Sequence, residues 1–265
     1  MLKFSFMSCV APGWNFDRLV EVAAELNYQG IEFRVGARQN HGVELGLSSE
    51  LIKNYKDKLA HANLEAACLA TSILYSPQAT AQHRFEINEQ ITVHIQLAAE
   101  LGAPLIRVSA KSFNNETELE SLVEDLRVAG EKAAAYGVTV ALETTAGLNS
   151  ARKVRAVLEK VNLASVGALW DVYHTSRSGE DLSESYDLLK PFLRHLHLNQ
   201  LMPQKRIITL SQPSPPVDFP AFFSLLQAAN YSGFVSGEWL GVPESQAFEL
   251  LKNYRLLLQN WLTLT

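Results

Sequence analysis

The feature that most constrains the fold is a regular alternation of short apolar runs and amphipathic stretches along the whole chain. Residues 2–8, "LKFSFMS", have the composition of a strand, and residues 15–27, "NFDRLVEVAAELN", repeat apolar positions at helical spacing. Strands that alternate with helices indicate βαβ units and a parallel sheet. Eight such units in 265 residues predict a closed (β/α)8 barrel, the TIM barrel.

The expected boundaries follow the change of period within each unit. Strands are predicted at residues 2–8, 30–35, 64–70, 104–110, 138–143, 166–172, 193–199 and 233–239. Helices are predicted at residues 15–27, 48–62, 80–101, 116–136, 150–161, 181–189, 218–230 and 243–261. Asn15 or Asp17 is the expected N-cap of the first helix, and Ser48 or Ser49 that of the second. Residues 200–217 contain "QPSPPV" and have the length typical of a functional lid.

A doubly wound open sheet is the main alternative to the barrel. It would be favoured by a Gly-rich phosphate loop after an early strand, and the chain has neither GxGxxG nor a Walker A motif. No shift in composition marks a domain boundary. Because α/β barrels commonly run to about 250 residues as one unit, residues 1–265 are expected to form a single TIM-barrel domain.

Composition excludes several classes of function. The formal net charge is −5 and no basic block is present, so no nucleic-acid surface is indicated. No run approaches the ~18 apolar residues of a membrane span, and "MLKFSFMSCVAPGW" has too short an apolar run for a secretory signal. Cys9 and Cys68 are isolated, which favours reduced, buried thiols in a cytoplasmic protein.

Polar residues gather at the carboxyl ends of the predicted strands, where TIM barrels carry their active sites. In chain order these residues are Glu32, Arg34, Arg107, Glu143, Asp171, His197 and Glu238. The last four lie on four successive strands. Buried carboxylates are costly unless they are paired or bind a cation, and this Glu, Asp, His and Glu set is mostly hard. It favours Mn²⁺, Mg²⁺ or Co²⁺, with Zn²⁺ also compatible.

Each acidic residue also has a purely structural interpretation. Glu143 could cap the fifth helix, and Asp171 could accept hydrogen bonds at the start of a loop. Glu238 could pair with Arg107 or Arg206. Taken together, these three acids and His197, at the ends of four adjacent strands, favour the metal interpretation.

The histidines and tryptophans near these strand ends leave alternatives open as well. A single His197 could be a core histidine, and His195 lies two residues earlier on the same face of the strand. His174 follows the sixth strand and could contact substrate or lie on the surface. Trp170 and Trp239 are expected to pack in the barrel wall.

These segments resemble the xylose isomerase-like TIM-barrel superfamily. The resemblance covers essentially the whole chain and rests on "GIEFR", "LETT", "WDVYH", "HLHLN" and "GEW" at the second, fifth, sixth, seventh and eighth strands. The superfamily contains sugar isomerases and epimerases, inosose and dehydroshikimate dehydratases, and endonuclease IV-type DNA repair enzymes. The resemblance implies four metal ligands, which are Glu143, Asp171, His197 and Glu238.

The same resemblance distinguishes the two histidines of the seventh strand and implies roles for two further positions. The second histidine of the family's HxH strand is the usual ligand, which favours His197 over His195. The family's D-x-x-H pattern implies that His174 contacts substrate, and Arg107 is similar to a substrate-binding arginine of the dehydroshikimate dehydratases. DNA repair enzymes of the family need many more His and carboxylate ligands, whereas this chain is acidic and has seven His.

The chain also departs from both enzyme subgroups. Asn149 stands where sugar epimerases often have a second Glu, and Gln200 stands where they have the acid of HxxD. Thr145 stands where dehydroshikimate dehydratases have a catalytic His, and Asn199 where they have a Lys. The resemblance therefore implies the metal site and leaves the substrate open.

The resemblance implies an isomerase or epimerase that acts on a small sugar or cyclitol substrate. In it, Glu143 and Glu238, on opposite sides of the metal, would remove and return a proton next to the carbonyl. A dehydratase of the inosose or dehydroshikimate type is the alternative, and a metal-free binding barrel is a third. No nucleic-acid or membrane partner is expected, and a homo-oligomer is left open.

Overall fold

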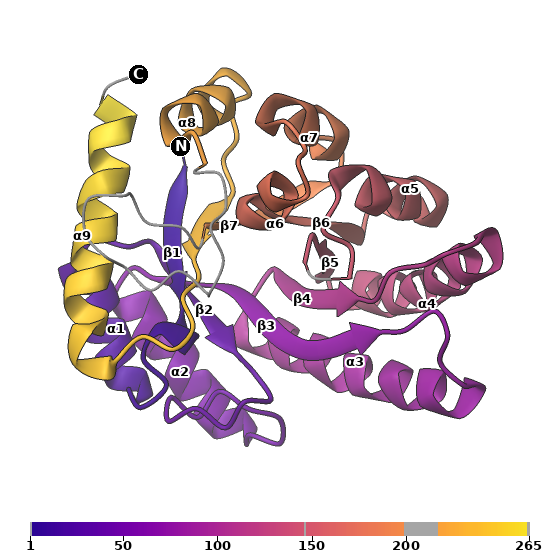
Figure 1. Ribbon diagram of the computed structural model, residues 1–265. Coiled ribbons are helices and arrows are strands. Elements are labelled where there is room, and N and C mark those ends of the chain that lie inside the picture. Colours follow the sequence, from indigo (N-terminus) through magenta and orange to yellow (C-terminus); the bar gives the residue numbers. More distant parts are fainter. Residues whose placement is uncertain (1, 146, 199–216, 264–265) are drawn as a thin grey trace.

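The eight strands form a closed parallel barrel. A computed structural model of the protein describes residues 2–145, 147–198 and 217–263, with side chains as far as residue 260. Each strand pairs in parallel with the next along the chain, and β8 pairs with β1 to close the ring. The helices follow one another around the outside in chain order (Figure 1). The predicted TIM barrel is confirmed, and the open-sheet alternative is wrong.

The boundaries of the elements agree with most of the predicted ranges. The strands are β1 (Lys3–Met7), β2 (Gly30–Arg34), β3 (Glu65–Tyr75), β4 (Leu105–Ala110), β5 (Thr139–Glu143), β6 (Val166–Asp171), β7 (Leu193–Leu198) and β8 (Phe234–Gly237). The helices are α1 (Phe16–Glu25), α2 (Ser49–His61), α3 (Ala81–Leu101), α4 (Glu116–Ala135), α5 (Ala151–Val161), α6 (Val172–Arg177), α7 (Leu182–Leu189), α8 (Phe219–Ala228) and α9 (Glu244–Thr263). A short 3₁₀ helix, η1 (Ser8–Val10), follows β1.

Side-chain caps begin the outer helices where the sequence predicts them. Asn15 accepts a hydrogen bond from the backbone N–H of Arg18 at the start of α1. Ser48 accepts one from Leu51 at the start of α2. Asn15 and Ser48 are therefore the caps, rather than Asp17 and Ser49. Each cap of this kind stabilises its helix by about 1 kcal/mol.

Three parts of the chain differ from the predicted pattern or lie outside it. β3 runs on to Tyr75 because buried Ile73 and Tyr75 alternate with the exposed Leu74, which gives the period of a strand. The short helix α6 was not predicted, and it forms because Asp171 caps it. The predicted lid at residues 200–217 lies outside the described residues, apart from Val217.

Two apolar regions fill the fold. The main core lies between the sheet and the surrounding helices and contains most of the large buried side chains. Inside the barrel, a smaller apolar cluster contains Cys68, Leu105, Ala141 and Leu169. Cys9 and Cys68 are both buried free thiols, as the sequence predicts.

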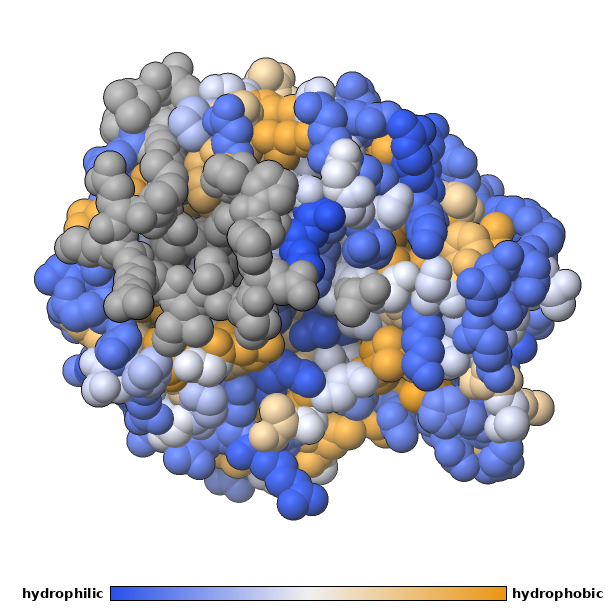
Figure 2. All heavy atoms as spheres, in the orientation of Figure 1, coloured by the Kyte–Doolittle hydropathy of each residue, from blue (hydrophilic) through white to orange (hydrophobic). Residues whose placement is uncertain are grey.

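The surface shows apolar side chains in separate places. Seven large hydrophobic residues are exposed among the described residues: Leu45, Leu74, Phe85, Val93, Tyr136, Leu240 and Leu256. On the face shown in Figure 2, orange patches are interrupted by hydrophilic side chains. Among the described helices, none is both long and apolar enough to cross a membrane.

Candidate metal centre

Four side chains from consecutive strands meet at the carboxyl end of the barrel. Glu143 ends β5, Asp171 ends β6, His197 lies in β7, and Glu238 follows the last residue of β8. Pairing of β6 with β7 places Asp171 opposite His197. One ligand atom from each of the four residues lies within 4.8 Å of those from the other three. The structure thus brings together the complete set that the sequence singled out.

His197 lies at the centre of this set. Its Nδ1 atom is 3.0 Å from Oε1 of Glu143 and 3.1 Å from Oε2 of Glu238. The side chains of His197 and Asp171 are fully buried or nearly so, whereas 16% of the Glu238 side chain is exposed. Glu238 is therefore the member of the set that solvent reaches most easily.

The charges of the set oppose one another when no cation is considered. Burial raises the pKa of Asp171 well above its ordinary value, and the charges of Glu238 and Glu143 raise it further. Burial also acts to raise the pKa of Glu143, but the Arg107 charge and the hydrogen bond with His197 lower it to about 2. Burial acts to lower the pKa of His197, but the charges of Glu32 and Glu238 raise it well above its ordinary value, so without a cation this imidazole offsets part of the negative charge of the three acids.

The donor set fits a divalent cation. Three carboxylates and one imidazole offer hard oxygen donors with a single borderline nitrogen, which suits Mn²⁺, Mg²⁺, Co²⁺ or Zn²⁺. A cation would also remove the repulsion that raises the pKa of Asp171. These residues are the ones that could hold a metal at the barrel mouth.

Arg107 provides positive charge from β4, the strand that pairs with β5. Its Nη1 atom is 3.4 Å from Oε2 of Glu143 and 3.4 Å from Oγ of Ser109. Burial lowers the pKa of Arg107, but the charges of Glu143 and Glu238 outweigh this effect and raise it. The Nε atom of Arg107 is buried and has no hydrogen-bond partner among the described residues.

His174 lies on α6 at the edge of the same mouth. Its Nε2 atom is 3.3 Å from Oγ1 of Thr145 and 3.8 Å from Oδ2 of Asp171. Burial lowers the pKa of His174, which favours the neutral imidazole. Thr145, one of the positions that departs from the family pattern, is thus a partner of His174. Asn199 and Gln200 lie outside the described residues.

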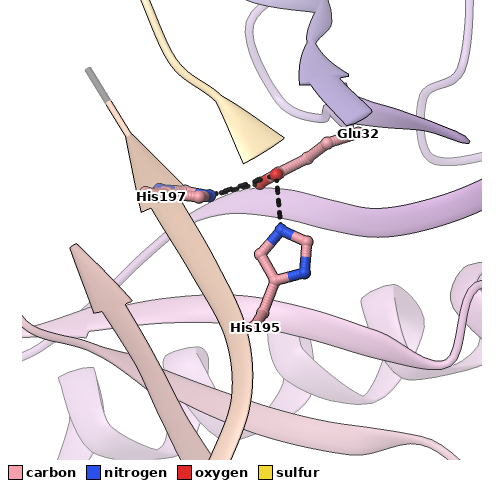
Figure 3. A group of neighbouring side chains, drawn as sticks. All are labelled: Glu32, His195 and His197. Carbon is pink, nitrogen blue, oxygen red and sulfur yellow. Dashed lines mark hydrogen bonds and ion pairs between the residues drawn. The ribbon is translucent and has the colours of Figure 1, made fainter. Parts of the chain in front are cut away.

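A second group of buried side chains lies against the same histidine. Oε2 of Glu32 is 2.9 Å from Nε2 of His195, and both oxygens of Glu32 are 3.0 Å from Nε2 of His197 (Figure 3). Burial acts to raise the pKa of Glu32, but the two imidazoles lower it well below its ordinary value. His195 therefore does not compete with His197 for a place in the four-residue candidate metal set, because it is hydrogen-bonded to Glu32.

In the sequence, Glu32 is recognisable as a strand-end residue, but its position there indicates no role for it. A signal was present in "GIEFR", where a single Glu interrupts an apolar run at a position that alternates with the core-facing residues. The two histidines of "HLHLN" also lie on one face of their strand. Glu32 on β2 is therefore a suitable hydrogen-bond partner for His195, the inward-facing histidine that is not a candidate metal ligand.

The structural interpretations of the acidic residues fare differently. Asp171 does accept hydrogen bonds from the backbone N–H groups of Tyr173 and His174, so it caps α6 while it faces the mouth. Glu143 does not cap α5, because Ser150 does. Arg107 is close to Glu143 rather than paired with Glu238.

The two tryptophans pack in the barrel wall, as expected. Trp170 is fully buried and its indole N–H donates to Oγ1 of Thr175. Trp239 packs edge-to-face against Tyr254, with ring centroids 4.7 Å apart. Arg206, the other arginine considered for Glu238, lies outside the described residues.

Comparison with known proteins identifies the family. The inosose dehydratase of Mesomycoplasma hyopneumoniae (strain 7448) is 23% identical over 268 residues, which cover 88% of this chain and 82% of that protein. A 3-keto-D-glucoside 4-epimerase from E. coli superposes with a TM-score of 0.75 at 19% identity, over 97% of this chain and 100% of that one. A D-psicose 3-epimerase from Clostridium cellulolyticum H10 gives a TM-score of 0.78 at 14% identity, over 98% of both chains.

At these identities the structural likeness establishes the fold alone. The family is established by a model described as "Xylose isomerase-like TIM barrel", which matches residues 20–257. That match spans every strand from β2 to β8 and all the side chains of the candidate centre. The chain belongs to the xylose isomerase-like TIM barrel family.

Proposed function

We propose that the protein is a divalent-metal-dependent isomerase or epimerase that acts on a sugar or a related polyol carbonyl compound. The observation that carries this proposal is the cluster of four donor side chains within 4.8 Å of one another at the active-site end of the barrel. Likeness to epimerases that act on sugars supports the same class of reaction. The reaction begins with removal of a proton from the carbon next to the carbonyl.

Glu143, Asp171, His197 and Glu238 would hold the cation. Mn²⁺, Mg²⁺ and Co²⁺ are the preferred ions, and Zn²⁺ is compatible with the same donors. When bound, the cation would supply Lewis-acid stabilisation of the negative charge that develops on the substrate oxygen.

The two glutamates are the proton-transfer groups in this proposal. Glu143 is kept ionised by Arg107 and His197, so it can accept a proton from substrate. Glu238 is the more exposed of the two, which suits a group that returns a proton to the substrate. Asp171 and His197 also make structural hydrogen bonds, because Asp171 caps α6 and His197 is hydrogen-bonded to Glu32. They would therefore serve as ligands alone.

Arg107 and His174 are the proposed substrate contacts. The Nε donor of Arg107 is buried and unpartnered among the described residues, so a hydroxyl or carboxylate of substrate would satisfy it. The side chain of His174 is 27% exposed and lies beside Asp171, where it can hydrogen-bond a substrate hydroxyl.

Incorporation of solvent deuterium tests the proposal without knowledge of the final product. The protein, loaded with Mn²⁺, is incubated in D₂O with a panel of ketoses and cyclitol ketones, and each substrate is followed by NMR. We expect deuterium to enter at the carbon next to the carbonyl of at least one compound. Absence of exchange across the panel in a metal-loaded protein would contradict the proposal.

A dehydratase is the second candidate, and the likeness to inosose dehydratase over 88% of this chain favours it. Proton abstraction next to the carbonyl is common to both reactions, and in a dehydratase the hydroxyl on the neighbouring carbon then leaves as water. Dehydration of a cyclitol ketone changes the ultraviolet absorbance, whereas epimerisation leaves it unchanged. The spectrum therefore separates the two.

A metal-free barrel that only binds a sugar or a protein is the third candidate. It predicts that no divalent ion accompanies the purified protein, and that none binds when it is added. Elemental analysis before and after incubation with Mn²⁺ distinguishes this candidate from both enzymes.

A further inference from the structure

We infer that Glu32 is a positioning residue of the metal centre, which holds His197 in the tautomer that carries its hydrogen on Nε2. This inference rests on the proposed function, because it assigns a role towards the proposed cation. It concerns a residue on β2, outside the four strands that supply the candidate ligands.

The two nitrogens of His197 face different groups. Nδ1 lies 3.0 Å from Glu143 and 3.1 Å from Glu238, so it points into the candidate metal set. Nε2 points the other way, at 3.0 Å from both oxygens of Glu32 (Figure 3). A neutral imidazole carries one hydrogen, and the nitrogen that binds a cation must lack it. Without a cation, Nδ1 faces two carboxylates, which only accept hydrogen bonds, so it carries a hydrogen as well. When a cation replaces the hydrogen on Nδ1, the hydrogen that stays is the one on Nε2, where Glu32 accepts it.

The surroundings of Glu32 fix its carboxylate in place. Glu32, His195 and His197 are all fully buried, so no water competes for the carboxylate from bulk solvent. His195 supplies a second donor, since its Nε2 is 2.9 Å from Oε2 of Glu32. The other ring nitrogen of His195, Nδ1, is buried without a hydrogen-bond partner among the described residues. This arrangement fits a neutral His195 that carries its hydrogen on Nε2.

Glu32 reaches His197 across the inside of the barrel. The register of β2 shifts between Ile31 and Glu32 where it pairs with β3, which is a local irregularity at this residue. The carboxylate can thus approach both inward-facing histidines of β7 from the opposite wall. Partners of this kind orient a ligating histidine and raise its basicity towards the metal.

The same three side chains could be read as a second cation site, since their donor atoms also lie within 4.8 Å of one another. That interpretation requires Nε2 of His197 to lose its hydrogen while Nδ1 binds the first cation. It would need an imidazolate, whereas the hydrogen-bonded interpretation needs only neutral histidines. The number of ions bound per chain separates the two interpretations.

Cation binding by variants provides the first test. Titration calorimetry with Mn²⁺ compares wild type, Glu32→Gln and the control Asp125→Asn. Asp125 is also a buried carboxylate, but it pairs with Arg84 between α3 and α4, outside the barrel. We expect one ion per wild-type chain, and an affinity about 10- to 100-fold weaker for Glu32→Gln. Asp125→Asn should bind as tightly as wild type.

Histidine NMR on the wild-type protein provides a second test that does not depend on a variant folding. The protein is labelled with ¹⁵N at its seven histidines and loaded with Zn²⁺, which is diamagnetic. We expect His197 to carry a hydrogen on Nε2 and to bind the ion through Nδ1. The reverse assignment, with the ion on Nε2, would overturn the inference.

The outcomes separate this inference from the proposed function. A wild-type protein that binds no cation contradicts both. A wild-type protein that binds one ion, with unchanged affinity in folded Glu32→Gln, overturns the role of Glu32 and leaves the proposed function standing. Two ions per wild-type chain, with one lost in Glu32→Gln, would also overturn it.

Discussion

The two halves of the barrel contribute opposite charges to the candidate centre. The β5–β8 half supplies every donor of the four-residue set, including three carboxylates. The β1–β4 half supplies Arg107 and Arg34, whose two positive charges exceed the single negative charge of Glu32, and it also carries a hydrogen-bonded network around His41. Burial lowers the pKa of Arg34, and the neighbouring Arg107 charge lowers it further. One half is thus an unbalanced negative site, and the other provides charge and support around it.

The largest expected effect comes from breaking the negative half at Glu143. Glu143→Gln removes the proposed proton acceptor and one ligand, and loss of a general base typically lowers turnover by about 10² to 10⁴-fold. The measurement is the rate of solvent deuterium exchange in the substrate that wild type processes. Glu65→Gln is the control, because Glu65 is exposed and paired with Lys3 at the amino-terminal ends of β3 and β1, away from the candidate centre. Full activity in Glu143→Gln would contradict the assigned role.

The next largest effect tests the positive half through Arg107. Arg107→Met leaves Glu143 in a buried site without its guanidinium partner. Breaking a buried ion pair by removing one partner typically costs about 3–5 kcal/mol. We expect the free energy of unfolding of the metal-free protein to fall by about 3 kcal/mol, the lower end of this range. Urea denaturation in the presence of EDTA measures it. Added Mn²⁺ should recover part of the loss, and unchanged stability without metal would show that Arg107 does not balance this site.

The two halves were not equally predictable from the sequence. The donors Glu143, Asp171 and Glu238 each end an apolar run, and strands of a parallel barrel end at the same rim, so local patterns were enough to bring them together. The role of Glu32 depends on which inward-facing residues of β2 and β7 lie at the same depth. That depth depends on the register across the barrel, including the shift at Glu32, and period alone does not reveal it.

Local chemistry also explains one helix that was not predicted and excludes one alternative role for Glu143. Helix α6 begins directly after Asp171, where the sequence suggested only the end of a strand, because the Asp171 carboxylate both faces the mouth and caps the helix. Glu143 was considered as a cap for α5, but Ser150 lies closer to that helix along the chain and has the side chain that caps prefer.

A smaller effect is the loss of stability at acidic pH that His41 causes in the β1–β4 half. In the β1–β4 half, Nδ1 of His41 accepts a hydrogen bond from the backbone of Val43, and burial lowers its pKa from 6.5 to about 4. The unfolded chain therefore binds a proton more readily, so the stability is complete above about pH 6.5 and is lost as the pH falls towards about 4. The full loss corresponds to about 3 kcal/mol.

His41→Asn tests this contribution. The Asn side chain can accept the hydrogen bond from Val43 but does not titrate, so the unfolding free energy should fall less steeply between pH 6.5 and 4 than in wild type. Urea denaturation at several pH values measures both slopes. Equal slopes in the two proteins would mean that the acid sensitivity arises elsewhere.

The smallest effect is a gain in stability rather than a loss, and it tests whether the three acids of the β5–β8 half require a cation. Asp171→Asn removes one of three clustered carboxylates, and Asn retains the side-chain oxygen needed to cap α6. Without metal, the variant should be more stable than wild type by about 1 kcal/mol, a typical single-site effect, because repulsion by Glu238 and Glu143 is relieved. With Mn²⁺ the order should reverse, since wild type gains stability from a bound ion and the variant binds it weakly. Urea denaturation with EDTA and with Mn²⁺ measures both differences. A variant less stable than wild type in EDTA would show that the acids are tolerated without a cation, and that the two halves are already balanced.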